Sequence, residues 1–152
     1  MSNNSTSLHR RTLLQLTLGA GVIAMAASAL PPASFAYDEN SKAAINVDAA
    51  GVALRGHDPV AYFTAGKPTV GDKQFSAKHE GATYYFASAA NRSEFEKNPA
   101  KYAPAFGGFC AMGAALGKKL NGDPANWRVF EDKLYLNVVA PAQKRWLEDI
   151  PG

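Results

Sequence analysis

Four side chains of this sequence could bind a soft or borderline metal ion, and they lie far apart in the chain: His57, His79, Cys110 and Met112. Imidazole, thiolate and thioether groups are the ligands of copper sites, and imidazole and thiolate also bind zinc. The spacing of the four residues matches no local ligand motif. The sequence therefore predicts a copper or zinc site on the condition that the fold brings these residues together.

Cys110 is the central candidate because it is the only cysteine of the chain. A single cysteine excludes an internal disulfide and any paired-cysteine redox or zinc motif. Gly107 and Gly108 precede it and would let the backbone approach a ligand closely. We also expect Cys110 near the start of a helix, where the helix dipole favours a thiolate. The alternative is that Cys110 is a small buried hydrophobic residue, as most free cysteines are.

An enzymatic function is a weaker hypothesis. Cys110 could supply a nucleophile, His57 or His79 a base, and Asp58 an orienting group, but nothing in the spacing requires this arrangement. Paired catalytic carboxylates, a phosphate-binding glycine loop and a serine nucleophile elbow are all absent from the sequence. A binding protein is therefore favoured over an enzyme.

Residues 1–36 have the pattern of an export signal. Arg10 and Arg11 precede an uncharged stretch over residues 13–30, and small residues end the segment at Ala36. The arginine pair resembles a twin-arginine signal. We therefore expect a periplasmic or secreted protein with no membrane span after cleavage, the alternative being an uncleaved membrane anchor. Removing the arginine pair takes away most of the formal net charge of +3, so nucleic acid is not an expected partner.

The rest of the chain is predicted to be a polar lead-in over residues 37–44 and one domain over residues 45–152. Its fold class is α+β, a small single domain with two antiparallel β-hairpins and several short helices and with no internal repeat. The hairpins are expected around the dipeptides Glu80-Gly81 and Glu131-Asp132. The other expected elements are a strand over 45–47, helices over 60–63, 89–97 and 141–150, a turn over 98–102 and a loop leading into a helix over 107–117.

Several of these segments carry a pattern that resembles the YHS domain, a module thought to bind metal. The pattern comprises Asp58-Pro59-Val60, the run from Gly81 to Ser88, Phe95, and the run from Asn98 to Tyr102. Residues 107–111, 122–124 with Trp127, and 133–137 extend the resemblance to a secreted family that contains this domain.

The resemblance implies the fold and an aromatic core that includes Tyr84, Phe86, Phe95 and Tyr102. It also implies metal-binding cysteines at three positions where this chain has other residues: Ala61, Ala87 and Asn91. Alanine cannot coordinate a metal, so the implied ligand set does not transfer to this chain.

Two functions follow as hypotheses. The first is an exported, metal-associated accessory protein for copper or zinc, with Cys110 as the central ligand. The second is a metal-free module that binds a small ligand or a protein partner in the periplasm, with Cys110 in a structural role.

Overall fold

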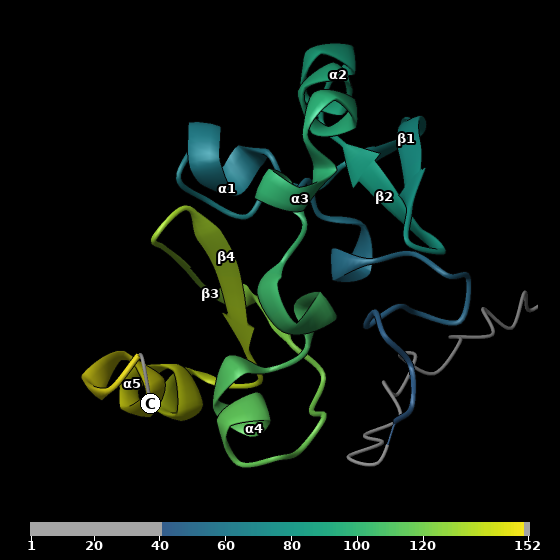
Figure 1. Cartoon of the computed structure of the whole chain (residues 1–152). Helices are drawn as coiled ribbons and strands as arrows, with labels where there is room; N and C mark the ends of the chain where they lie inside the picture. The colour runs from purple at the N-terminus through teal and green to yellow at the C-terminus, as the bar shows by residue number, and fades with distance from the viewer. Residues whose placement is uncertain (1–40, 151–152) are drawn as a thin grey trace, which may run out of the picture. The chain divides into compact units, whose positions relative to one another are not determined.

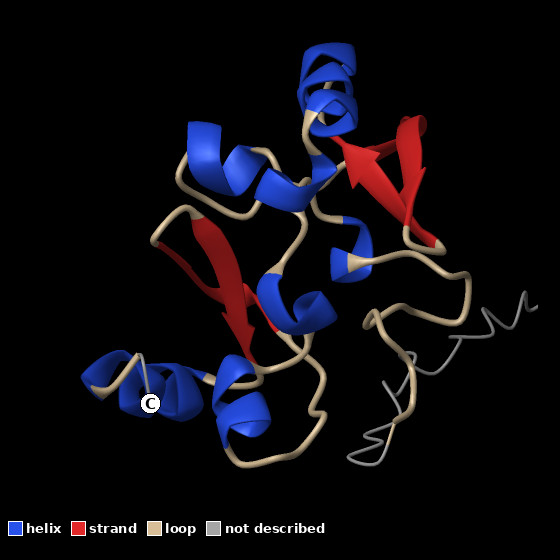
Figure 2. Cartoon of the chain, viewed as in Figure 1, coloured by secondary structure: helices blue, strands red, loops and turns tan. Residues whose placement is uncertain are grey.

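A computed structural model describes residues 41–150, which lie within one compact unit of the chain, Ser34–Gly152. The described part is an α+β fold of two β-hairpins and short helices, as predicted (Figures 1 and 2). In chain order the elements are η1 (Leu54–Gly56), α1 (Ala61–Thr64), β1 (Asp72–His79), β2 (Ala82–Phe86), α2 (Ala89–Lys97), α3 (Pro99–Tyr102), η2 (Ala105–Gly108), α4 (Ala111–Ala115), β3 (Asp123–Phe130), β4 (Lys133–Asn137) and α5 (Ala140–Glu148), where η1 and η2 are 3-10 turns.

Local sequence signals explain most of these boundaries. The β1–β2 and β3–β4 hairpins turn at the predicted dipeptides. Ser88 caps α2, because its hydroxyl oxygen accepts a hydrogen bond from the Asn91 N–H at 3.1 Å. Two predictions need correction. Residues 45–47 form no strand, only a single bridge from Val47 to Ala53, and α5 ends at Glu148, before the predicted end at residue 150.

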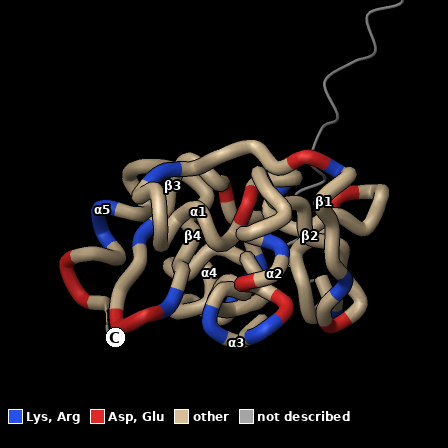
Figure 3. The backbone as a smooth tube through the Cα atoms, turned by 90° about the horizontal axis from the view of Figure 1, so that it is seen from above, with Lys and Arg blue, Asp and Glu red and all other residues tan. Residues whose placement is uncertain are grey.

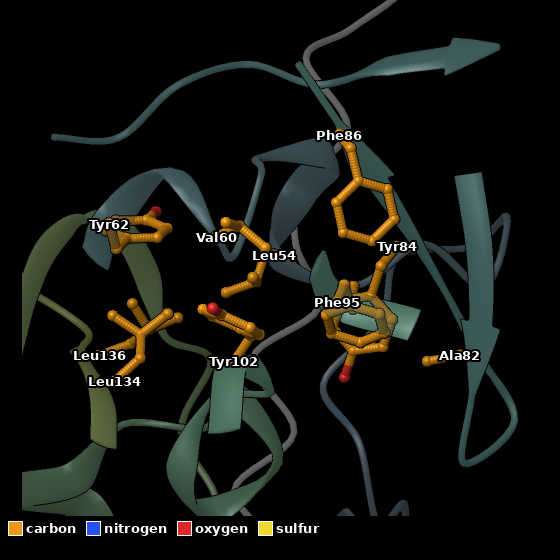
Figure 4. Close-up of a cluster of buried hydrophobic side chains, with 11 residues drawn as sticks. Leu54, Val60, Tyr62, Ala82, Tyr84, Phe86, Phe95, Tyr102, Leu134 and Leu136 are labelled. Atoms are coloured by element: carbon orange, nitrogen blue, oxygen red, sulfur yellow. The ribbon is translucent and has the colours of Figure 1, made fainter. Parts of the chain in front are cut away.

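One hydrophobic core joins the two hairpins (Figure 4). The aromatic residues that the resemblance placed in the core are all buried there. The core consists of Ala53, Leu54, Val60, Tyr62, Ala82, Tyr84, Phe86, Phe95, Tyr102, Leu134 and Leu136. Because β2 and β4 both contribute to this cluster, neither hairpin has a core of its own.

The backbone of the described residues contains a structural repeat, although the sequence shows none. The hairpin β1–β2 has strands of eight and five residues and is followed by the nine-residue helix α2. The hairpin β3–β4 has the same strand lengths and is followed by α5, also of nine residues. Each hairpin also has an irregularity in the same place, between Asp72 and Ser76 in the first and between Asp123 and Trp127 in the second.

The segments before the two hairpins are also equivalent. Three consecutive residues with positive φ open each of them, 54–56 in the first and 106–108 in the second. Two residues later, the Asp58 N–H donates to the Thr69 carbonyl at 2.8 Å, and the Cys110 N–H donates to the Leu120 carbonyl at 2.7 Å. We call residues 54–97 the first copy and residues 106–148 the second copy; α3 lies between them.

The repeat is invisible in the sequence because the two copies share backbone geometry and few side chains. Leu54 of the first copy corresponds to Phe106 of the second, and Asp58 corresponds to Cys110. Residue types that differ this much produce no self-similarity, although the turns and bulges they adopt are the same.

Within residues 41–150, no helix is long and apolar enough to span a bilayer. The predicted signal over residues 1–36 lies outside the described residues.

Candidate functional site

The two histidines of the predicted metal set have other neighbours. His57 follows η1, and its Nδ1 lies 3.0 Å from the Leu54 carbonyl oxygen. His79 ends β1, where its ring packs edge-on against Phe95 with 5.8 Å between centroids. Its Nε2 lies 3.9 Å from a carboxylate oxygen of the exposed Glu80. Across residues 41–150, no three His, Cys, Asp or Glu side chains lie close enough together to hold a metal ion.

The thiol of Cys110 and the backbone of Met112, the other two predicted ligand residues, both contact Asn137. Cys110 is fully buried and begins α4 as predicted: its Sγ accepts from the Gly113 N–H at 3.3 Å and donates to Asn137 Oδ1 at 3.5 Å. The backbone N–H of Met112 donates to the same Asn137 oxygen at 3.1 Å. The thiol therefore caps a short helix inside the protein, a structural role that needs no ligand.

Asp58 occupies the corresponding place in the first copy, and it is also fully buried. Its Oδ1 accepts from the backbone N–H groups of Val60 at 2.8 Å and Ala61 at 3.3 Å. Its Oδ2 accepts from the Ala87 N–H at 2.8 Å and from the Asn91 side-chain amide at 2.6 Å. Four N–H donors thus stabilise the buried carboxylate and tie the start of α1 to the start of α2.

The three positions for which the resemblance implies metal-binding cysteines therefore meet at Asp58. The residues present do not fit a metal there: two are alanines, and Asn91 turns a donor N–H toward the carboxylate. Both Asp58 oxygens already accept hydrogen bonds. Hydrogen bonds to Asp58 join the segments that meet at this junction.

Two hollows of the described residues lie in a groove between α4 and α5, elements that pack side by side (Figure 1). One hollow has a volume of about 540 Å³ and the other about 370 Å³. Ala115 and Trp146 line both of them, and we call the pair of hollows the α4–α5 groove. The larger hollow also borders charges of both signs on α5 and the residue after it: Lys144, Arg145, Glu148 and Asp149.

A row of three aromatic rings lines one side of this groove. The Phe106 ring lies 6.0 Å from the Tyr135 ring, which lies 4.8 Å from the Trp146 ring. Phe106 is 54% exposed and has φ +52°, a left-handed conformation that is costly for a bulky residue. Sequence reasoning missed this row. The signal that could have indicated it is the phenylalanine directly before Gly107-Gly108, at a turn that needs positive φ.

Tyr84, like Asn137 with its Nδ2, carries a buried polar atom that has no hydrogen-bond partner among the described residues. In Tyr84 this atom is the hydroxyl oxygen. Burial, together with the nearby Glu80 carboxylate, raises the pKa of Tyr84 to about 12. Neither hollow of the α4–α5 groove includes Tyr84, which belongs to the core.

The fold and the groove define a small α+β module with an aromatic-lined surface site. Residues 60–106 match the model of the YHS domain, so the chain carries a YHS domain there. The match spans just under a third of the chain and runs from α1 through α3, which covers most of the first copy. Searches of curated proteins and of solved structures found no match.

Proposed function

We propose that this protein is an exported YHS-domain binding module and that the α4–α5 groove is its binding site. The observation that carries the proposal is Phe106, a large apolar side chain that is half exposed in a strained backbone conformation. The left-handed turn belongs to both copies, since Leu54 at the corresponding position has φ +53°, so it is the exposure of Phe106 that sets this residue apart. The core does not need this ring, since the corresponding Leu54 is buried and Phe106 is not.

The chemistry of the groove favours ligands with a flat apolar group. Its two hollows fall in the size range of small-ligand sites, which is roughly 300–1,000 Å³. The exposed Phe106 ring and the partly buried Tyr135 ring beside it offer aromatic surface, and aromatic side chains anchor ligands at little conformational cost. Lys and Arg are interspersed with Asp and Glu along the described chain, so no single-sign field selects the ligand (Figure 3).

A fluorescent aromatic probe, 1-anilinonaphthalene-8-sulfonate, tests the site. We expect the probe to bind the native protein and the Ala115→Glu variant to bind it about tenfold more weakly, because the carboxylate enters both hollows. Ala50→Glu is the matched control, an exposed alanine in a turn outside the groove. Equal binding by both variants, or no binding by the native protein, would refute the groove as the binding site.

In this proposal Cys110 is structural. The hypothesis of a copper or zinc accessory protein with Cys110, His57, His79 and Met112 as ligands stays a prediction, and the YHS match is what favours it. Metal analysis of the protein with stoichiometric copper(I) or zinc(II), beside Cys110→Ala, distinguishes the two. Retention of metal that is lost in Cys110→Ala would support the accessory protein and contradict a purely structural cysteine.

The export part of the proposal rests on residues 1–36. We expect the protein to reach the periplasm of a bacterial host, and the substitution of Lys for both Arg10 and Arg11 to keep it in the cytoplasm. Cell fractionation measures this directly. Unchanged export of the double variant would rule out the twin-arginine route.

A further inference from the structure

The residue two positions after each capping residue differs between the copies. In the first copy it is Val60, whose side chain has no exposed surface. In the second copy it is Met112, which is only partly buried and lines the larger hollow of the α4–α5 groove. In both copies the backbone N–H at this position donates to a side-chain oxygen, at 2.8 Å and 3.1 Å respectively. The second copy thus presents a thioether side chain at the groove where the first copy buries a valine.

Two sulfur-containing residues lie close together in this part of the second copy, and they differ in access. Cys110 has no exposed surface, and its Sγ already takes part in two hydrogen bonds. A thiol reacts as the thiolate, so Cys110 needs both solvent contact and the loss of a proton. The thioether of Met112 has no proton to lose and needs only contact with the oxidant. A small oxidant that enters the groove therefore meets Met112 before Cys110.

Oxidation of Met112 would change the wall of the groove. Met112 and Ala115 lie three residues apart on α4 and are the residues through which this helix lines the larger hollow. Conversion to a sulfoxide makes a flexible apolar side chain polar. A flat apolar ligand that covers this wall would bury the sulfoxide oxygen away from water, which weakens binding unless the oxygen finds a donor.

We propose that Met112 is a site of oxidation by peroxides and that the sulfoxide weakens binding in the α4–α5 groove. With hydrogen peroxide, one oxygen atom bonds to Sδ of Met112, the O–O bond breaks, and the other oxygen leaves as water with both hydrogens. The sulfur loses two electrons, which the peroxide takes up. This inference rests on the proposed function, because it names a covalent change that regulates the same groove.

Mass spectrometry locates the added oxygen. The full-length protein is treated with hydrogen peroxide in the native state and in urea, then unfolded, alkylated and digested with trypsin, which releases residues 102–118 as one fragment. In the native protein we expect one added oxygen at Met112 and an alkylated, hence intact, Cys110. The native rate should lie within about tenfold of the rate in urea, because Met112 is partly exposed. A slower native rate, or oxidation of Cys110 ahead of Met112, would overturn the inference.

Fluorescence of 1-anilinonaphthalene-8-sulfonate measures the effect on binding. The oxidised protein should bind this probe about tenfold more weakly than the untreated protein, because the sulfoxide lies in the wall that the probe covers. Met112→Leu has a side chain of similar size without sulfur, so the affinity of this variant for the probe should be the same before and after peroxide. A loss of affinity in the treated variant would assign the effect to another residue and overturn the inference.

The outcomes separate this inference from the proposed function. If Ala115→Glu weakens probe binding and oxidation of Met112 does not, the inference is overturned and the proposed function stands. If the native protein does not bind the probe, both are overturned.

Discussion

At the scale of single residues, Asp58 carries a carboxylate that is completely buried and has therefore lost its hydration. A charge with no exposed surface is stable only when hydrogen bonds replace its hydration, and Asp58 receives four. Two come from the turn that leads into α1, from the backbone N–H groups of Val60 and Ala61. The other two come from Ala87 and Asn91, about thirty residues away, which no local pattern could indicate.

The first prediction concerns Asn91. Asn91→Asp replaces an N–H donor by a second carboxylate 2.6 Å from Asp58, so we expect the free energy of unfolding to fall by about 2–3 kcal/mol. Urea unfolding measures the loss. Asn98→Asp is the matched control, since Asn98 is exposed and aspartate caps α3 equally well. A loss no larger than that of the control would contradict the role of Asn91.

The second prediction concerns Cys110. A thiol with no exposed surface that already takes part in two hydrogen bonds should react with a disulfide reagent only when the protein opens. We expect labelling of the native protein to be slower than labelling in urea by on the order of 10³-fold or more. Rapid labelling of the native protein would favour a reactive or ligand-exchanging thiol instead.

At the scale of elements, turns that need positive φ position the groove. Gly107 has φ +62°, and a Cβ there would clash with the Ala44 carbonyl oxygen. Gly66 has the same φ, and a Cβ there would meet nothing within 4 Å. An alanine at Gly66 would therefore report the energetic cost of the backbone conformation alone, whereas an alanine at Gly107 would report that cost together with the cost of the steric clash.

The third prediction uses this pair. Gly66→Ala should cost about 1 kcal/mol of stability, because only the conformation is unfavourable. Gly107→Ala should cost at least about 2 kcal/mol, since the neighbouring chain at Ala44 must also move. Thermal unfolding compares the two variants. Equal losses would show that the Ala44 segment yields freely, and that Gly107 is needed for its φ alone.

Sequence reasoning predicted these elements well where the signal is local. The hairpin turns at residues 80–81 and 131–132 and the capped helix α2 were all confirmed. The groove was missed because its walls come from η2, α4, β4 and α5, which only the tertiary fold brings together. Gly107 and Gly108 precede Cys110 in the sequence and were expected to let the backbone approach a ligand. Gly107 instead makes room for the chain at Ala44.

At the scale of the whole molecule, stability should depend on alkaline pH. The pKa of Tyr84 is raised to about 12, against about 10 in an unfolded chain, because burial disfavours the phenolate. The folded state therefore holds the proton more tightly than the unfolded state. The contribution is fully present below pH 10 and is lost as the pH rises through about 12. The pKa of Tyr62 is also raised, chiefly by burial, with Asp123 and Asp58 adding to the effect.

The fourth prediction follows from this titration. Tyr84→Phe removes a buried hydroxyl that has no partner among the described residues, so we expect little change or a small gain in stability at pH 7. Between pH 10 and 12 the variant should lose less stability than the native protein, with Tyr62 accounting for the remainder. Circular dichroism at a series of pH values measures both. An identical alkaline transition in the variant would show that Tyr84 does not contribute.

The duplicated architecture has a consequence for the behaviour of concentrated protein. Two halves with the same backbone geometry share one core, and Ala103 and Pro104 join them between α3 and η2. The first copy of one chain can dock on the second copy of another chain through the same core contacts that it makes within its own chain. Refolding at high protein concentration should therefore yield domain-swapped dimers. After dilution, these dimers should return to monomers only as fast as the shared core opens.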